Sequence, residues 1–336
     1  MDYEAFLKEW YNDSPTVLVH TSGSTGQPKP MLVEKRRMEA SARITCSFLG
    51  LRKGGTALLC LPLDYIAGKM MAVRAIVWKL QTVCLKPSNH PFERFKPDEN
   101  SIIDLAAMVP SQVYETLKVP EECEQLRRVR HLLIGGGAVD RKMQEQLQDF
   151  PHAVWSTYGM TETLSHIALR RLNGPERSDW YTPFEGVSVE LNDEGCLVIH
   201  APAVYDGPLV THDIAVVQDG RFRILGRSDN VICSGGVKIQ MEKVERLLQL
   251  HTPVPFIITK APDAKLGEQV VMLTESSDIE SLSSLCQKVL PRYWQPRRIL
   301  TVPVLPLTET SKPARKVAEQ MAREMGSYGE YKLVKQ

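Results

Sequence analysis

The sequence predicts an α/β protein with a large N-terminal domain and a small α+β domain at the C-terminal end. Three observations support this fold class. Strand-like apolar runs alternate with helical stretches over residues 16–156, as in βαβ units around a mainly parallel sheet. Two hairpin patterns between residues 187 and 225 indicate a small antiparallel sheet or distorted barrel. The pattern changes again after Gly226, so we expect domains of residues 1–226 and 227–336.

The expected elements follow from the spacing of apolar residues. Tyr3, Phe6 and Trp10 recur at helical spacing, so a short helix is expected before the Ser14-Pro15 stop. Further helices are expected at residues 35–50, 66–80, 241–250 and 278–290. Strands are expected at residues 16–20, 56–61, 83–86, 102–105, 131–134, 153–156, 187–191, 196–200, 215–217, 221–225, 254–260, 269–274 and 299–303.

Composition excludes several classes of protein. The 41 Lys and Arg residues nearly balance the 40 Asp and Glu residues, which argues against nucleic acid or a membrane surface as the partner. The apolar stretches are too short to span a bilayer, and no secretory signal is visible at residues 1–10. The seven cysteines stand singly, without a CxxC pair, so we expect reduced thiols in a cytoplasmic protein.

The segment TSGSTGQPK at residues 21–29 is typical of a phosphate-binding loop. Small residues let backbone N–H groups converge on an anion, and Ser22, Ser24, Thr25 and Lys29 add further donors. It matches neither the GxxxxGK[ST] loop nor GxGxxG. The alternative is a flexible Ser/Gly loop.

Two segments after expected strands could also meet a nucleotide. In YGMTET, residues 158–163, the Glu162 carboxylate beside the Thr161 hydroxyl could hold Mg²⁺ that bridges phosphates. The alternative is a helix start capped by Thr161. Glycines 135–137 would let a flat ligand approach the backbone, or would form an ordinary tight turn.

Five candidates follow after residue 210. Asp213 in Thr-His-Asp could accept from both hydroxyls of a ribose, and Arg227 could contact the same sugar. Asp229 could act as a hinge at the domain boundary. A second glycine-rich turn occupies residues 234–238, and Lys312 stands in a polar loop, where the alternative is a solvated surface lysine.

In this order, the segments resemble the superfamily of acyl- and aryl-CoA synthetases, adenylation domains and luciferases. The match covers residues 16–320 and rests on TSGSTGQPK, YGMTET, THD, GRSDN and the terminal lysine loop. The resemblance implies that a carboxylate attacks the α-phosphate of MgATP, and that a thiol, usually coenzyme A, then displaces AMP. It implies the cofactors ATP, Mg²⁺ and coenzyme A.

The resemblance also implies residue roles. Lys312 would bridge carboxylate and phosphate as a catalytic residue with Thr161 and Glu162, and Glu162 would hold Mg²⁺. The small domain would be mobile about Asp229, and Tyr65 would gate the acid pocket. Coenzyme A would meet Ser234, Gly235, Gly236 and Lys238. ATP or AMP would meet Thr21, Ser22, Gly23, Ser24, Thr25, Gly26, Lys29, Gly135, Gly136, Tyr158, Gly159, Asp213 and Arg227.

The chain departs from the superfamily in length and at single positions. Only 20 residues precede the phosphate loop, so the usual N-terminal subdomain is missing and a partner or second copy would cover the exposed sheet. His212, Asn230 and Ser311 replace the usual Gly, Asp and Gly.

Within the superfamily, the chain looks most like short bacterial ortho-succinylbenzoate–CoA ligases of menaquinone synthesis. A substrate with two carboxylates would need a cation besides Lys312, for which Lys69 is a candidate; the alternative is a solvated helix lysine. Three other functions stay open: ligation of another small carboxylic acid to coenzyme A, loading of a carrier-protein thiol, and a non-catalytic nucleotide-binding remnant.

Overall fold

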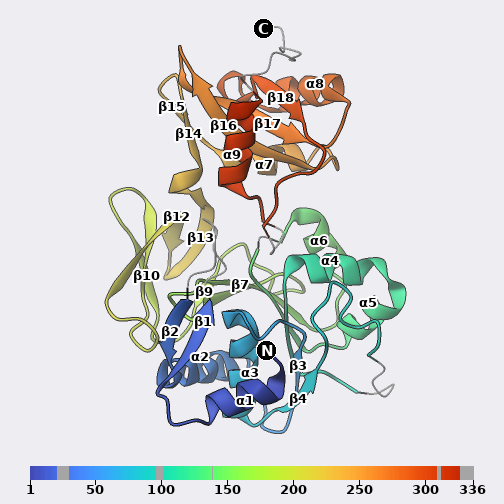
Figure 1. Cartoon of the computed structure of the whole chain (residues 1–336), viewed down its shortest axis with the longest axis vertical. Helices are drawn as coiled ribbons and strands as arrows, with labels where there is room; N and C mark the ends of the chain where they lie inside the picture. Colours follow the sequence, from blue (N-terminus) through green and yellow to red (C-terminus); the bar gives the residue numbers. More distant parts are fainter. Residues whose placement is uncertain (21–29, 96–100, 138, 309–311, 326–336) are drawn as a thin grey trace. The chain divides into compact units, whose positions relative to one another are not determined.

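The computed structural model describes residues 1–20, 30–95, 101–137, 139–308 and 312–325 (Figure 1). Internal contacts divide the chain into two compact units. The first contains Met1–Glu190, Val198–Leu209 and Val217–Arg223, and the second contains Leu191–Leu197, Val210–Val216 and Ile224–Gln336. Whether the functional boundary falls at residue 226 stays a prediction.

A seven-stranded sheet forms the centre of the first unit. Its order is β4-β3-β5-β6-β7-β8-β9, and the pairs from β4 to β7 are all parallel, as the alternating pattern predicts. β8 and β9 continue the sheet in antiparallel pairing. The strands are β3 (Thr56–Leu59), β4 (Gln81–Cys84), β5 (Leu105–Met108), β6 (His131–Ile134), β7 (Ala153–Gly159), β8 (His166–Arg171) and β9 (Thr182–Pro183).

Helices pack on this sheet through apolar side chains. Val113, Leu126, Met143 and Leu147 join buried strand residues such as Leu132 in one core cluster. The helices of the unit are α1 (Tyr3–Trp10), α2 (Lys35–Phe48), α3 (Ile66–Trp78), α4 (Pro110–Lys118), α5 (Pro120–Arg127) and α6 (Arg141–Gln146).

The strand predicted before the glycine-rich loop does not join the parallel sheet. β1 (Thr16–His20) instead forms a separate antiparallel ribbon with β2 (Pro30–Glu34), in which Val17 opposes Val33. The predicted phosphate loop, residues 21–29, lies between these strands and outside the described residues.

Helix α1 is fastened to the rest of the first unit by a buried ion pair. Asp2 caps the helix by accepting from the backbone N–H of Ala5, at 2.8 Å. Glu9 Oε2 lies 2.7 Å from Lys69 Nζ on α3, and the side chains are 23% and 3% exposed. Glu9 Oε1 also accepts from the backbone N–H of Leu18 on β1. One carboxylate thus ties α1 to both α3 and β1.

The two predicted hairpins form a four-stranded sheet with the order β10-β11-β12-β13. Its residues are divided between the two units. The strands are β10 (Ser188–Leu191), β11 (Cys196–His200), β12 (Pro208–Gln218) and β13 (Arg221–Arg227).

The rest of the second unit is a five-stranded sheet with helices on both faces. The order is β15-β14-β17-β16, and β18 pairs with β17. Successive residues on β16 alternate between faces: Ile258 packs with Val244 and Leu282, whereas Ile257 packs with Ala318. The elements are β14 (Val231–Ser234), β15 (Val237–Gln240), α7 (Met241–Gln249), β16 (Phe256–Asp263), β17 (Gly267–Thr274), α8 (Ile279–Val289), β18 (Arg298–Thr301) and α9 (Arg315–Glu324).

Among the described residues, no helix has the length and apolar character needed to cross a bilayer.

The Glu9–Lys69 pair should contribute to the free energy of unfolding. We expect Glu9→Gln to lower the free energy of unfolding by about 3 kcal/mol, because it leaves the Lys69 ammonium buried without a counter-ion. Urea denaturation measures the change. Adding Lys69→Met should restore most of the loss, and Glu4→Gln on the exposed side of α1 should stay within about 0.5 kcal/mol of the parent. A double variant as unstable as the single one would contradict the prediction.

Candidate functional site

The candidate site of the first unit lies where its parallel strands end. The carboxyl ends of β3, β5, β6 and β7 meet at one edge of the sheet, which is where open α/β sheets bind ligands. Gly135 and Gly136 follow β6, and Tyr158 and Gly159 end β7. The structure therefore brings these four predicted residues to the same edge.

The glycines after β6 keep side chains away from this edge. A Cβ atom at Gly135 would lie 2.4 Å from Thr157 Oγ1, and Gly136 has a φ of +79°. Both positions therefore require glycine, for close approach and for backbone conformation respectively.

Gly159 lies where β7 and β8 come closest together. The strand register shifts between Tyr158 and Gly159, and a Cβ atom at Gly159 would lie 2.2 Å from the carbonyl oxygen of Ser165. Only a glycine lets the two backbones meet at this distance. This close approach of β7 and β8 holds the two ends of the YGMTET turn together.

The YGMTET segment forms a tight turn between two strands, so the alternative of a helix start is wrong. The Thr163 hydroxyl accepts from Met160 N and donates to Ser165 O, at 3.1 and 2.8 Å. Leu164 has a φ of +64°, a conformation that is rare for a branched side chain and is often found at functional sites. The turn leaves Thr161 half-buried and Glu162 exposed.

An aromatic cluster supports the ring of Tyr158. Its centroid lies 4.9 Å from that of Phe222, edge to face, and 5.7 Å from that of Tyr181. The Tyr181 hydroxyl is 2.8 Å from Ser156 Oγ. The sequence analysis missed Tyr181 and Phe222, because only the pairing of their backbones in the folded chain brings them together.

Tyr65 precedes helix α3 and is half-buried. Its backbone pairs with that of His20, the last residue of β1. The predicted acid gate therefore lies beside the point where the predicted phosphate loop begins. The loop residues themselves, Thr21, Ser22, Gly23, Ser24, Thr25, Gly26 and Lys29, lie outside the described residues.

The alternative of a solvated Lys69 is wrong, because this side chain is buried. Its charge is already compensated by Glu9, and the ammonium lies 5.4 Å from the centre of the Phe6 ring. A lysine held in this way is poorly suited to meet a second substrate carboxylate.

Arg74, five residues further along α3, is a buried cation without a described counter-ion. It is 2% exposed, and the described part of the chain gives it no ion pair with a carboxylate. One NH2 group donates to Ser165 Oγ at 2.6 Å and lies 3.5 Å from His166 Nε2, whereas Nε has no partner. Burial lowers the pKa of Arg74 to about 10. The sequence analysis overlooked it, although an arginine inside the apolar run of residues 70–78 is itself a signal.

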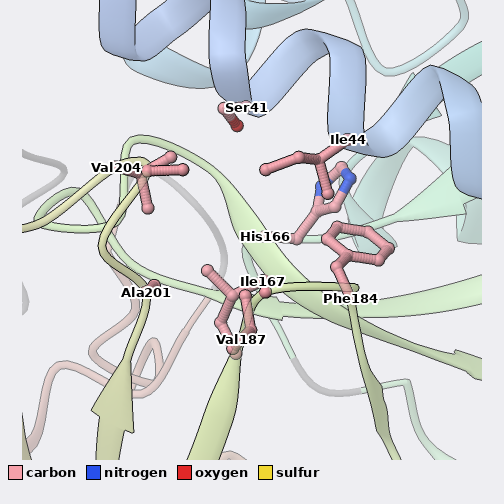
Figure 2. Close-up of a pocket in the computed structure, with 10 residues that line it drawn as sticks. Ser41, Ile44, His166, Ile167, Phe184, Val187, Ala201 and Val204 are labelled. Atoms are coloured by element: carbon pink, nitrogen blue, oxygen red, sulfur yellow. The ribbon is translucent and has the colours of Figure 1, made fainter.

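A small apolar hollow lies beside His166 (Figure 2). Ile44 from α2, Phe184 and Val204 line it with His166, whose ring packs edge to face on Phe184. Burial and the charge of Arg74 lower the pKa of His166 well below 6.5, so this imidazole is neutral. The hollow includes none of the predicted site residues, and its lining offers no charge, so we do not assign it to the candidate site.

In the second unit, the predicted ribose and hinge residues form one charged cluster. Arg227 NH1 lies 3.2 Å from Asp213 Oδ1, while Arg227 Nε and NH2 hold both carboxylate oxygens of Asp229, at 2.9 and 2.8 Å. Burial alone would raise the pKa of Asp229, but the hydrogen bonds and charge of Arg227 lower it below its ordinary value. Arg227 thus links the predicted sugar ligand to the predicted hinge.

Lys312 belongs to the same charged surroundings. Loss of hydration and the positive charge of Arg227 lower the pKa of Lys312 below 10.5, and the Asp213 carboxylate opposes them.

The second glycine-rich turn joins β14 to β15. Gly235 and Gly236 have φ values of +57° and +81°, which this tight turn requires. Ser234 is buried and Lys238 is exposed.

The AMP-binding enzyme family matches residues 5–210. The chain belongs to this family. Among solved structures, an acyl-CoA synthetase (AMP-forming)/AMP-acid ligase II-like protein from Dyadobacter fermentans is 33% identical, with a TM-score of 0.64 over 94% of this chain and 92% of that one.

Other relatives of this AMP-binding enzyme are named as ligases of one acid. The 2-succinylbenzoate–CoA ligase of Bacillus mycoides is 24% identical, over 96% of this chain and 73% of the relative. An o-succinylbenzoate CoA synthetase from Bacillus subtilis, in complex with its acyl-adenylate intermediate, is 22% identical with a TM-score of 0.74, over 94% of this chain and 70% of that one.

The predicted superfamily, the two-domain α/β fold class and the AMP-forming ligase class of this AMP-binding enzyme are confirmed. The roles of single residues stay predictions.

Proposed function

We propose that this AMP-binding enzyme joins 2-succinylbenzoate to coenzyme A in menaquinone biosynthesis, through an acyl-adenylate. The observation that carries the choice of acid is the buried, uncompensated guanidinium of Arg74 beside the YGMTET turn. The names of the relatives point in the same direction.

In the first half-reaction, a carboxylate oxygen of the acid attacks the α-phosphorus of ATP and pyrophosphate leaves. In the second, the thiol sulfur of coenzyme A attacks the acyl carbon and AMP leaves. Two anions approach each other in the first step, so a preorganised cation lowers its barrier. Lys312 would supply that cation, and Asp213 with Arg227 would hold the ribose.

The residues present suit Mg²⁺. A B. subtilis relative was solved with ATP and magnesium. No group of three or more His, Cys, Asp or Glu side chains is placed to hold a metal in the described residues. Mg²⁺ that is bound through ATP phosphates needs only one or two protein oxygens, which Glu162 and Thr161 would provide. When bound, it would neutralise phosphate charge.

Arg74 would recognise the second carboxylate of the acid. Its NH2 group donates to Ser165, which follows the YGMTET segment and lies against Gly159, so the guanidinium contacts the end of this turn. A buried cation without a counter-ion costs free energy, and an anionic ligand would offset this cost. A monocarboxylate consumed in adenylate formation would leave Arg74 uncompensated, whereas a dicarboxylate would not.

ATP–pyrophosphate exchange with a panel of carboxylic acids tests this function. Exchange with 2-succinylbenzoate, and a thioester on adding coenzyme A, would support it. Exchange with another acid only would keep the reaction and discard the substrate. Transfer to a carrier-protein thiol but not to coenzyme A would support the carrier-loading alternative, and no exchange at all would favour a nucleotide-binding remnant.

The role of Arg74 predicts opposite effects on stability and activity. We expect Arg74→Met to leave the free energy of unfolding unchanged or higher without ligand, because it removes an uncompensated buried charge. The KM for 2-succinylbenzoate should rise about 10–100-fold, since a charged hydrogen bond contributes about 1.5–3 kcal/mol. An analogue that lacks one carboxylate serves as the control, and its KM should not change. Equal loss with both acids would contradict the role.

The lowered pKa of Lys312 predicts an alkaline limit to the first half-reaction. Adenylation needs the charged ammonium, so exchange should decline as the pH rises through a value below 10.5. We expect Lys312→Arg to lose most activity but to lack this decline, because arginine stays charged. Lys312→Ala should slow exchange about 10²–10³-fold. Identical alkaline limbs in the parent and Lys312→Arg would exclude Lys312 as the titrating group.

A further inference from the structure

Arg315 begins helix α9, three residues after Lys312, and its side chain points into the second unit. Its two NH groups contact the two carboxylate oxygens of Glu245 on α7, each at 2.7 Å. NH1 also donates to the carbonyl oxygen of Ile258 on β16, at 2.8 Å. Such a bidentate pair fixes orientation as well as distance.

Glu245 is held in turn by the same strand. Its Oε1 accepts from the backbone N–H of Ile258 at 2.9 Å, and the residue is 9% exposed. Arg315, Glu245 and Ile258 thus form a closed network that joins α9, α7 and β16. Figure 1 shows α9 beside β16 in the second unit.

The loop that carries Lys312 is closed just before this network. Ala314 N donates to Pro306 O at 2.9 Å, and Thr308 N donates to Lys312 O at 2.7 Å. Residues 307 and 313 are also paired as an isolated bridge. The described residues on the two sides of 309–311 are therefore paired with each other, and the second side leads directly into Arg315.

We propose that Arg315, held by Glu245, is a positioning residue that sets the place of the Lys312 ammonium for adenylation. This inference rests on the proposed function, because Arg315 matters here only if Lys312 supplies the cation for adenylation. A displacement of about 1 Å at a reacting group can lower the rate about 10²-fold. The contact that holds Arg315, three residues after Lys312, therefore affects the rate although Arg315 touches no substrate.

The test uses variants that keep the small unit folded. Arg315→Met alone leaves the Glu245 carboxylate buried and unpaired, so it is combined with Glu245→Gln, which removes both charges and keeps an acceptor for Ile258 N–H. Arg315→Lys keeps the charge without the planar fork. Arg323→Met removes an exposed ion pair to Glu319 on the same helix and serves as the control.

The readout separates the two half-reactions of the full chain. We expect the double variant to slow ATP–pyrophosphate exchange about 10²-fold. Its rate of thioester formation from supplied acyl-adenylate and coenzyme A should stay within about twofold, since Lys312 acts in the first step only. Arg315→Lys should recover part of the loss, and Arg323→Met should match the parent.

A second comparison identifies the residue through which Arg315 acts. In a Lys312→Ala background, the double change should cause no further loss of exchange, whereas independent or purely structural effects would add. Parent-like exchange in the double variant, equal slowing of both half-reactions, or a further loss in the Lys312→Ala background would overturn the proposal. Failure of the proposed function shows separately, as a parent without exchange or a Lys312→Ala variant with full exchange; the latter also removes the basis of the Arg315 proposal.

Discussion

Burying a cation costs free energy unless an anion lies beside it, and three buried or half-buried cations of this chain differ in how far this cost is offset. Lys69 is paired with Glu9, and the pair fastens α1 to the first unit. Arg315 is paired with Glu245, and the pair joins three elements of the second unit. Arg74 contacts the Ser165 hydroxyl and the His166 imidazole, and has no carboxylate partner among the described residues. Two of the cations therefore hold structure together, while the third is the one that we propose for recognition of the acid.

Local sequence patterns located β3, β6 and β7 of the parallel sheet, but the strands predicted at 83–86 and 102–105 lie two residues after and three residues before the observed β4 and β5. Runs such as residues 131–134 are short, apolar and followed by glycine, and strands of this kind are buried on both faces. The same patterns could not place β1, because an apolar strand beside a polar loop suits a parallel sheet and a hairpin ribbon equally. Helix α9 was also missed, since its buried face consists of small residues such as Ala318 and Ala322.

The candidate site shows a similar division. Gly159 and Asp213 could be found from the sequence because their motifs are contiguous. The sequence could not show that Lys69 is paired and Arg74 is not, because the partner of Lys69 is Glu9, sixty residues earlier in the chain. Tyr181 and Phe222 likewise become neighbours of Tyr158 only through strand pairing. Contacts between distant segments thus decide which of these two buried cations has a counter-ion within the fold.

The five-stranded sheet of the second unit carries both of its candidate loops. The Ser234–Lys238 turn leaves β14, which pairs with β17 at Gly267. The segment that follows Lys312 is held on β16, a second neighbour of β17, through Arg315. Any rotation of this sheet as a rigid body would therefore displace both loops together. If the two loops serve successive steps, movement of the shared sheet governs the change from one step to the next. A mutation that makes this sheet more rigid or more mobile would therefore alter the timing of both steps.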